Sequence, residues 1–211
     1  MPGMTNDPKR RAAEFVAGGL ESGARLLRRY SRQVRGGGRV LVLGGVRSGK
    51  SRHAEQLMSR HGQVVYVAGG KPPGNDDPEW AARVAAHRQR RPLSWRTVEP
   101  TDLAHTLRTT RAPMLVDCLG TWLARVLDDV GAWEQTEGWQ QRVDDRLADV
   151  VDAWQSVTVP IVAVSNEVGS GVVPGTASGR MFRDVLGALN TAVAANSDSV
   201  RLVVAGRVVH L

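Results

Sequence analysis

The clearest chemical signal in the sequence is a glycine-rich segment with the pattern G-x-x-x-x-G-K-[ST]. It consists of Gly44, Gly45, Val46, Arg47, Ser48, Gly49, Lys50 and Ser51. Its glycines allow consecutive backbone N–H groups to point at phosphate oxygens, and a helix that begins here adds its positive end. In such a loop the lysine reaches the outer phosphates and the hydroxyl ligates Mg²⁺. The segment predicts a bound nucleotide; the alternative is a chance glycine-rich turn.

An acidic residue, Asp117, ends the apolar run "PMLVD". The carboxyl ends of parallel strands present ligands at one edge of a sheet, so this carboxylate can hold Mg²⁺ together with Ser51. The alternative role is that of a cap for a helix that begins near Leu119, and the two roles are compatible. We predict the metal role for Asp117.

A histidine surrounded by arginines lies in the stretch "AARVAAHRQRRPLSWRTVEP", residues 81–100. Arg88 follows His87 directly, and Arg90 and Arg91 lie about one helical turn away. Taken alone, the stretch is typical of a solvated basic face with an incidental histidine. The alternative is covalent chemistry, in which a neutral imidazole attacks a nucleotide α-phosphate. Neighbouring guanidinium groups favour the neutral ring and neutralise the growing phosphate charge, so the cluster suits a nucleotidyl-histidine without requiring one.

Strand-like and helix-like segments alternate from residue 39 onward and must position these groups. The strands are predicted at 39–44, 63–69, 94–99, 112–118 and 159–166, with a terminal strand pair in 200–211 around Gly206. The helices are predicted at 51–60, 77–91, 101–109, 119–130, 137–155 and 178–196. This alternation predicts an α/β fold, a mainly parallel sheet with helices on both faces. The glycine-rich segment then lies between a strand and a helix, as phosphate binding requires.

A second glycine-punctuated loop follows the predicted buried strand at 159–166. Asn166 and Glu167 begin it and either contact a substrate or hold the loop. Arg180 and Arg183 lie one turn apart on the next predicted helix, where they either reach a phosphate or belong to an ordinary helix surface. The residues alone leave both alternatives open.

The charge of the chain is concentrated at its beginning. The 211 residues carry a net charge of +7, but residues 1–39 hold nine basic side chains against three acidic ones. The rest holds 19 against 18, so the body is nearly neutral and no nucleic-acid partner is expected for it. We predict an N-terminal extension at 1–38 and one domain at 39–211. The extension has an amphipathic pattern that predicts a helix. This helix either packs on its own domain or docks on an anionic membrane surface or a partner.

The compartment is predicted from what the sequence lacks. A single cysteine, Cys118, forms no internal disulfide, and no apolar run is long enough to span a membrane. The N-terminus has no apolar region typical of a secretory signal. These features favour a reducing, cytoplasmic setting.

Residues 39–211 resemble the bifunctional adenosylcobinamide kinase / adenosylcobinamide-phosphate guanylyltransferase family of cobalamin biosynthesis. The resemblance rests on "LGGVRSGKSRHAE", "VVYVA", "RVAAHRQRRPLSWRTVE", "LVDCLGTWL" and "SNEVGSGVVPGTASGRMFRDVLGALN", in this order. It implies a P-loop NTPase with a RecA-like sheet, and a homotrimer with the nucleotide between subunits. The chain departs from the family pattern at Gly69-Gly70, Gly120, Arg125 and Thr191, and residues 1–38 have no counterpart in it.

The resemblance implies two reactions, with ATP and GTP as substrates and Mg²⁺ as cofactor. The hydroxyl of adenosylcobinamide takes a γ-phosphate; GTP then guanylylates His87, and adenosylcobinamide phosphate accepts the GMP. Lys50 and His87 are the implied catalytic residues. The implied nucleotide-binding residues are 44–51, Ala68, Gly69, Gly70, Arg88, Gln89, Arg90, Arg91, Glu99 and Asp117. Two competing functions are a P-loop kinase in which His87 is inert and a RecA-like, nucleic-acid-binding ATPase.

Overall fold

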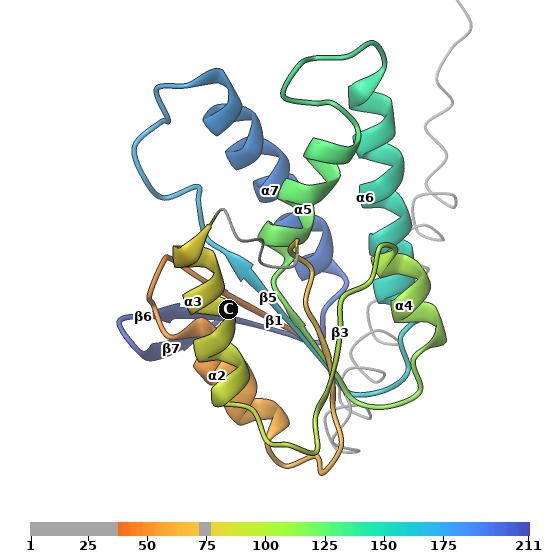
Figure 1. Ribbon diagram of the computed structural model, residues 1–211, viewed down its shortest axis with the longest axis vertical. Coiled ribbons are helices and arrows are strands. Elements are labelled where there is room, and N and C mark those ends of the chain that lie inside the picture. Colours follow the sequence, from red (N-terminus) through yellow and green to blue (C-terminus); the bar gives the residue numbers. More distant parts are fainter. Residues whose placement is uncertain (1–37, 72–76) are drawn as a thin grey trace, which may run out of the picture. The chain divides into compact units, whose positions relative to one another are not determined.

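The computed structural model of the protein describes residues 38–71 and 77–211 (Figure 1). The predicted helix of the N-terminal extension lies outside these residues, and so does most of the loop after the second predicted strand. The domain boundary near residue 38 therefore stays a prediction.

The described residues form one seven-stranded sheet in the order β3-β2-β4-β5-β1-β6-β7. The strands are β1 Arg39–Gly44, β2 Val65–Val67, β3 Arg96–Val98, β4 Met114–Asp117, β5 Ile161–Asn166, β6 Ser199–Val204 and β7 Arg207–His210. All paired neighbours run parallel except β6 and β7. Ala205 and Gly206 link these two with left-handed backbone angles, φ 48° and 76°. The predicted mainly parallel sheet with a C-terminal strand pair is confirmed.

Helices cover both faces of this sheet (Figure 1). They are α2 Lys50–Met58, α3 Pro78–Gln89, α4 Leu103–Thr109, α5 Leu119–Asp129, α6 Trp139–Ser156 and α7 Ala177–Ala195. Helices α4 to α7 share one buried cluster with Leu41 and Leu43, whereas Val42 packs with α2 in a second cluster. Successive β1 side chains thus point to opposite faces, as the pleat of a strand requires. None of the described helices is long and apolar enough to cross a membrane.

The ends of the elements differ from the predicted ones by a few residues. The strand predicted at 94–99 begins at Arg96, because Trp95 still belongs to a turn in which its N–H donates to the Pro92 carbonyl at 3.0 Å. The strand predicted at 63–69 spans only Val65–Val67, although the Ala68 N–H still donates to the Val98 carbonyl at 2.9 Å. Such differences leave the order and type of the elements as predicted.

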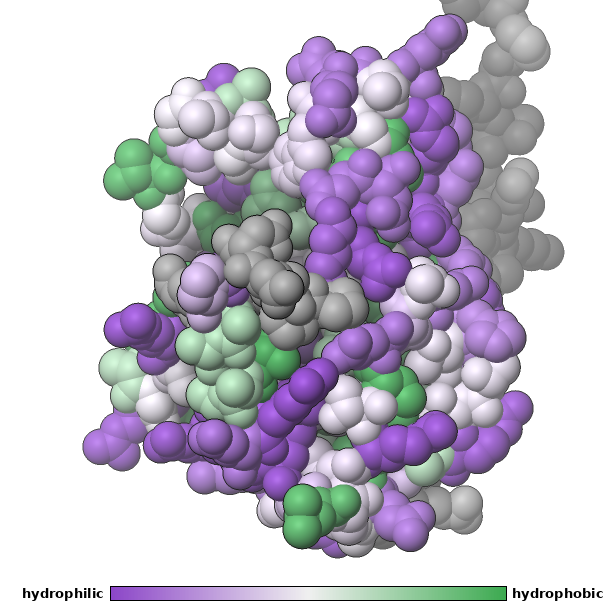
Figure 2. Space-filling view, in the orientation of Figure 1, coloured by the Kyte–Doolittle hydropathy of each residue, from purple (hydrophilic) through white to green (hydrophobic). Residues whose placement is uncertain are grey.

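The surface in Figure 2 is largely hydrophilic, with apolar areas (green) in separate places. Exposed large apolar side chains in the described part of the chain include Val46, Leu93, Val172, Val173, Val204, Val209 and Leu211. They come from the glycine-rich segment, two loops and the β6–β7 hairpin, rather than from one element.

The carboxyl ends of the central strands bring the predicted chemical groups together. β1 ends at Gly44, where the glycine-rich segment begins, and Gly44 pairs in register with Asn166 at the end of β5. Asp117 ends β4 and lies opposite Val164 of β5. Since these strands are neighbours in the sheet, segments far apart in the sequence meet at one edge.

Candidate active site

The glycine-rich segment folds as a loop around the start of α2. Gly49 has φ 95° and Arg47 has φ 57°, so the backbone turns through the left-handed region twice. At Gly44 an added Cβ would lie 2.5 Å from Ser48 Oγ and 2.7 Å from the Val203 carbonyl, so this position requires glycine. The Lys50 ammonium donates to the Gly45 carbonyl at 3.1 Å. The loop thereby brings its lysine back over its own backbone, where a phosphate chain would lie.

A cavity of about 900 Å³ opens beside this loop. Many of the predicted site residues line this cavity. They are Val46, Arg47, Ser48, Gly49, Lys50, Ser51, Ala68, Gly70, His87, Arg88, Arg90, Arg91, Glu99, Asp117 and Asn166. Its volume is within the range typical of small-molecule sites, up to ~1,000 Å³. One cavity therefore contains both the loop lysine and the histidine.

Asp117 accepts hydrogen bonds from two sides of this cavity. Its Oδ1 accepts a hydrogen bond from the Ser51 hydroxyl at 3.3 Å, and its Oδ2 accepts one from the Tyr66 hydroxyl at 3.0 Å. The same Oδ2 lies 3.5 Å from His87 Nδ1. Burial alone raises the pKa of the Asp117 carboxyl, but the contacts with His87, Tyr66 and Ser51 outweigh burial and hold this pKa below its usual range.

The Asp117 carboxylate and the Ser51 hydroxyl can serve as metal ligands. Their oxygens are hard donors at the start of α2, which is the type of ligand that Mg²⁺ prefers. Glu55, His87 and Asp117 also have potential ligand atoms within 4.8 Å of one another. The donors present fit a divalent cation beside the glycine-rich loop.

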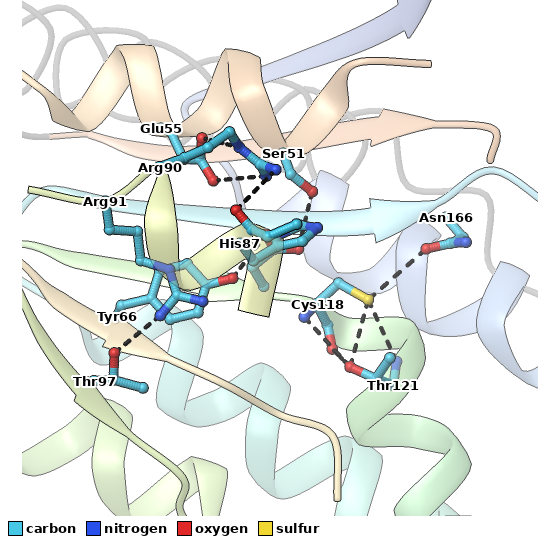
Figure 3. A network of polar contacts seen from close by, with 12 residues as sticks. Ser51, Glu55, Tyr66, His87, Arg90, Arg91, Thr97, Cys118, Thr121 and Asn166 are labelled. Atoms are coloured by element: carbon cyan, nitrogen blue, oxygen red, sulfur yellow. Dashed lines mark hydrogen bonds and ion pairs between the residues drawn. The ribbon is translucent and has the colours of Figure 1, made fainter. Parts of the chain in front are cut away.

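The arginines beside His87 differ from expectation in what they contact. Arg90 donates to both carboxylate oxygens of Glu55 at 3.2 and 3.1 Å, and Arg88 donates to Glu99 at 2.9 Å. The guanidinium of Arg91 lies 3.3 Å from the centre of the Tyr66 ring (Figure 3). Acidic partners therefore balance two of the three cations, and the charged group that contacts the imidazole is the Asp117 carboxylate.

Several assigned residues do not line the cavity. Glu167 accepts from the backbone N–H groups of Gly169 and Ser170, at 2.7 and 3.1 Å, and so holds its own loop. Arg180 donates to the carbonyls of Pro174 and Gly175, both at 2.9 Å. Others that lie away from the lining are Gly44, Gly45, Gly69, Gln89 and Arg183, the last of which pairs with Asp184 at 3.0 Å. In this structure Glu167 and Arg180 organise the 167–180 loop.

Gly69 lies close to α5. An added Cβ would lie 2.8 Å from the Cβ of Trp122 and 3.1 Å from the Cys118 carbonyl. We expect Gly69→Ala to lower the free energy of unfolding by about 1–3 kcal/mol, because neither neighbour is a flexible chain end. Urea unfolding followed by tryptophan fluorescence measures the change.

The control for this prediction is Gly187→Ala, a position in α7 where an added Cβ meets nothing within 4 Å. Alanine inside a helix is expected to stabilise by about 0.5–1 kcal/mol. Equal stability of Gly69→Ala and the unmodified protein would contradict the packing role.

Tyr66 lines the cavity and donates to Asp117, but the sequence did not predict it as part of the site. It lies within "VVYVA", which is predicted to be a strand, and an aromatic side chain is common in a strand. The available signal was its hydroxyl, because a buried phenol needs a hydrogen-bond partner. That partner, Asp117, is 51 residues away and is adjacent only because β2 pairs with β4.

The ionisation of Tyr66 should be suppressed in the folded protein. Burial, followed by the Asp117 charge, raises the pKa of Tyr66 far above its usual value. The neutral phenol therefore contributes stability that is present below about pH 10, the unfolded pKa, and is lost as the pH rises further. Alkaline titration of tyrosinate absorbance should reveal Tyr66 only when the protein unfolds, and Tyr66→Phe should remove that phase. Ionisation of both tyrosines near pH ~10 in the folded state would contradict this result.

Comparisons with known proteins match most of the chain. The family model described as CobU, cobinamide kinase / cobinamide phosphate guanyltransferase, matches residues 40–211. The chain is 38% identical to the bifunctional adenosylcobalamin biosynthesis protein CobU of Escherichia coli K12 over 176 residues, 79% of this chain and 96% of that protein. It is 39% identical to CobU of Salmonella typhimurium LT2, with the same coverage of both chains. It is 40% identical to the corresponding protein CobP of Pseudomonas aeruginosa PAO1 over 175 residues, 80% of this chain and 94% of that protein.

Proposed function

The chain belongs to the cobinamide kinase / cobinamide phosphate guanyltransferase family, and from this premise we propose that one cavity, the one at the P-loop, serves both reactions. The enzyme is a kinase and a guanylyltransferase of adenosylcobalamin biosynthesis. It phosphorylates adenosylcobinamide with ATP or GTP and then transfers GMP from GTP to the product. The observation that carries the proposal is that Lys50 and His87 line the same cavity.

The kinase step uses the P-loop. The substrate hydroxyl oxygen attacks the γ-phosphorus, the bond from that phosphorus to the bridging oxygen breaks, and the nucleoside diphosphate leaves. Backbone N–H groups of residues 46–51, which line the cavity, and the start of α2 hold the phosphates. Lys50 exchanges its contact with the Gly45 carbonyl for the outer phosphates, whose negative charge attracts it more strongly.

Ser51 and Asp117 would hold Mg²⁺. The support is the donor set itself, a hydroxyl and a buried carboxylate 3.3 Å apart beside the P-loop. When bound, the ion neutralises phosphate charge and orients the chain of phosphates. Asp117 is well suited to this role because contacts already keep its carboxyl ionised.

The transfer step uses His87. A ring nitrogen attacks the α-phosphorus of GTP, the bond to the bridging oxygen breaks, and pyrophosphate leaves. The phosphate of adenosylcobinamide phosphate then attacks the same phosphorus and releases the histidine. Arg88, Arg90 and Arg91 also line the cavity, where their charges can stabilise the pyrophosphate that departs.

Incubation with GTP labelled at the α-phosphate, without a corrinoid acceptor, tests this proposal. The expected result is acid-labile, alkali-stable label on the protein, mapped by mass spectrometry to His87, with release of pyrophosphate. GTP labelled at the γ-phosphate should leave the protein unlabelled. Absence of α-label while the kinase reaction proceeds would support the alternative in which the enzyme is a kinase and His87 is inert.

Three further features belong to the same proposal. A homotrimer with the nucleotide between subunits is implied by the family resemblance. The basic extension at 1–38 either packs on its own domain or contacts a membrane surface or partner. A cytoplasmic setting agrees with Cys118, which is buried and free.

A further inference from the structure

One polar contact orients the imidazole of His87. Its Nδ1 lies 3.5 Å from Asp117 Oδ2, and no other polar contact of the ring is present among the side chains that the structure describes. About a third of the side chain, 32%, is exposed, whereas 7% of Asp117 is exposed. The edge of the ring that holds Nδ1 therefore faces a buried carboxylate, and the edge that holds Nε2 has no protein partner among these residues.

We propose that Asp117, held in place by Tyr66, orients His87 so that Nε2 is the nitrogen that is guanylylated. This inference rests on the proposed function, in which His87 carries GMP. A carboxylate only accepts hydrogen bonds, so the proton of the neutral ring is placed on Nδ1. The lone pair then belongs to Nε2, on the side of the ring away from Asp117. Asp117 and Tyr66 are positioning residues, because they affect the reaction through the orientation of His87.

Hydrogen bonds hold both oxygens of the Asp117 carboxylate. Ser51 donates to Oδ1 and Tyr66 donates to Oδ2, so rotation of the carboxylate would break both hydrogen bonds. Tyr66 is 2% exposed, and Arg91 stacks on its ring while donating to Thr97 at 2.9 Å. A continuous chain of contacts thus runs from β3 through Arg91, Tyr66 and Asp117 to the histidine.

The step balances without a further reactant. The Nε2 lone pair forms the bond to the α-phosphorus while the bond to the bridging oxygen breaks, and that electron pair leaves with pyrophosphate. Nδ1 keeps its proton, so the guanylylated ring carries a positive charge that Asp117 neutralises. In the second half of the reaction an oxygen of the corrinoid phosphate bonds to the phosphorus and the N–P electron pair returns to Nε2.

The position of the N–P bond tests the proposal directly. The full-length protein, with ¹⁵N-labelled histidine, is guanylylated with GTP and digested at alkaline pH. Long-range ¹H–¹⁵N NMR spectra of the His87 peptide then identify the modified nitrogen. Modification at Nε2 is the expected result. Modification at Nδ1 would overturn this inference and leave the proposed function intact, whereas an unmodified His87 would overturn both.

Tyr66→Phe tests the positioning role separately, because it removes only the hydroxyl. We expect the single-turnover rate of guanylyl-histidine formation to fall about ten-fold, the usual size of one hydrogen bond's effect. The GTP concentration for half-maximal rate should change less than about two-fold, since a lost orienting contact acts on chemistry rather than on binding. Tyr30→Phe, which removes the other tyrosine hydroxyl of the chain, is the matched control. An unchanged rate in Tyr66→Phe would refute the positioning role.

Discussion

His87→Ala is expected to lower guanylyl transfer by at least about 10⁴-fold while adenosylcobinamide phosphate accumulates. In the proposed mechanism the substitution removes the atom that forms the covalent bond, and Nε2 of His53, another imidazole that lines the cavity, is in contact with Arg201 Nη1 at 3.2 Å. The kinase step attacks the γ-phosphate with a substrate hydroxyl and needs no imidazole. Chromatographic separation of the corrinoid products over time measures both steps in one reaction.

His105→Ala is the matched control for this prediction. His105 lies on the exposed surface of α4, and its backbone N–H, which Asp102 caps at 2.8 Å, remains after the substitution. Both activities should stay within about two-fold of the unmodified enzyme, as is usual for a surface position. Continued guanylyl transfer in His87→Ala would exclude His87 as the carrier of GMP.

Lys50→Ala is expected to lower both activities by about 10³-fold. In the proposed mechanism both reactions develop charge on a triphosphate held by the same P-loop, and removal of one preorganised cation from such a site has an effect of this size. The GTP-dependent labelling of His87 and the phosphorylation of adenosylcobinamide should be measured on the same preparation. If one cavity serves both reactions, the two rates should fall by a similar factor.

Lys71→Ala supplies the control for the loss of a lysine at the same cavity. Lys71 pairs with Asp128 at 2.6 Å on the surface, and such exposed pairs contribute little. Neither rate should change more than about three-fold. If Lys50→Ala abolished only the kinase reaction, GTP would have to bind elsewhere during guanylyl transfer, and the single-cavity proposal would fail.

Asp117 links the two halves of the site. One of its oxygens contacts the hydroxyl of Ser51 at the P-loop, and the other contacts His87 and Tyr66. A single carboxylate therefore borders both the predicted metal position and the predicted nucleophile. This arrangement explains in physical terms how one P-loop cavity can support phosphoryl and nucleotidyl transfer.

The sequence by itself determined the features that depend on local pattern. The alternation of β-branched runs with helical periodicity predicted the order of strands and helices, and the spacing of Gly44, Gly49 and Lys50 predicted the phosphate loop. Both predictions rest on residues near one another in the chain. The placement of Asp117 at a strand end was likewise readable, because an apolar run that ends in an acid is a local signal.

The tertiary structure alone decided the partners of the charged side chains. Sequence proximity predicted that Arg88, Arg90 and Arg91 would set the charge around His87, but they contact Glu99, Glu55 and Tyr66 instead. The group beside the imidazole is Asp117, which is 30 residues further along the chain. Which side chains meet depends on the order of strands in the sheet, here β2 beside β4, and that order is set by the packing of the whole domain rather than by periodicity within any segment.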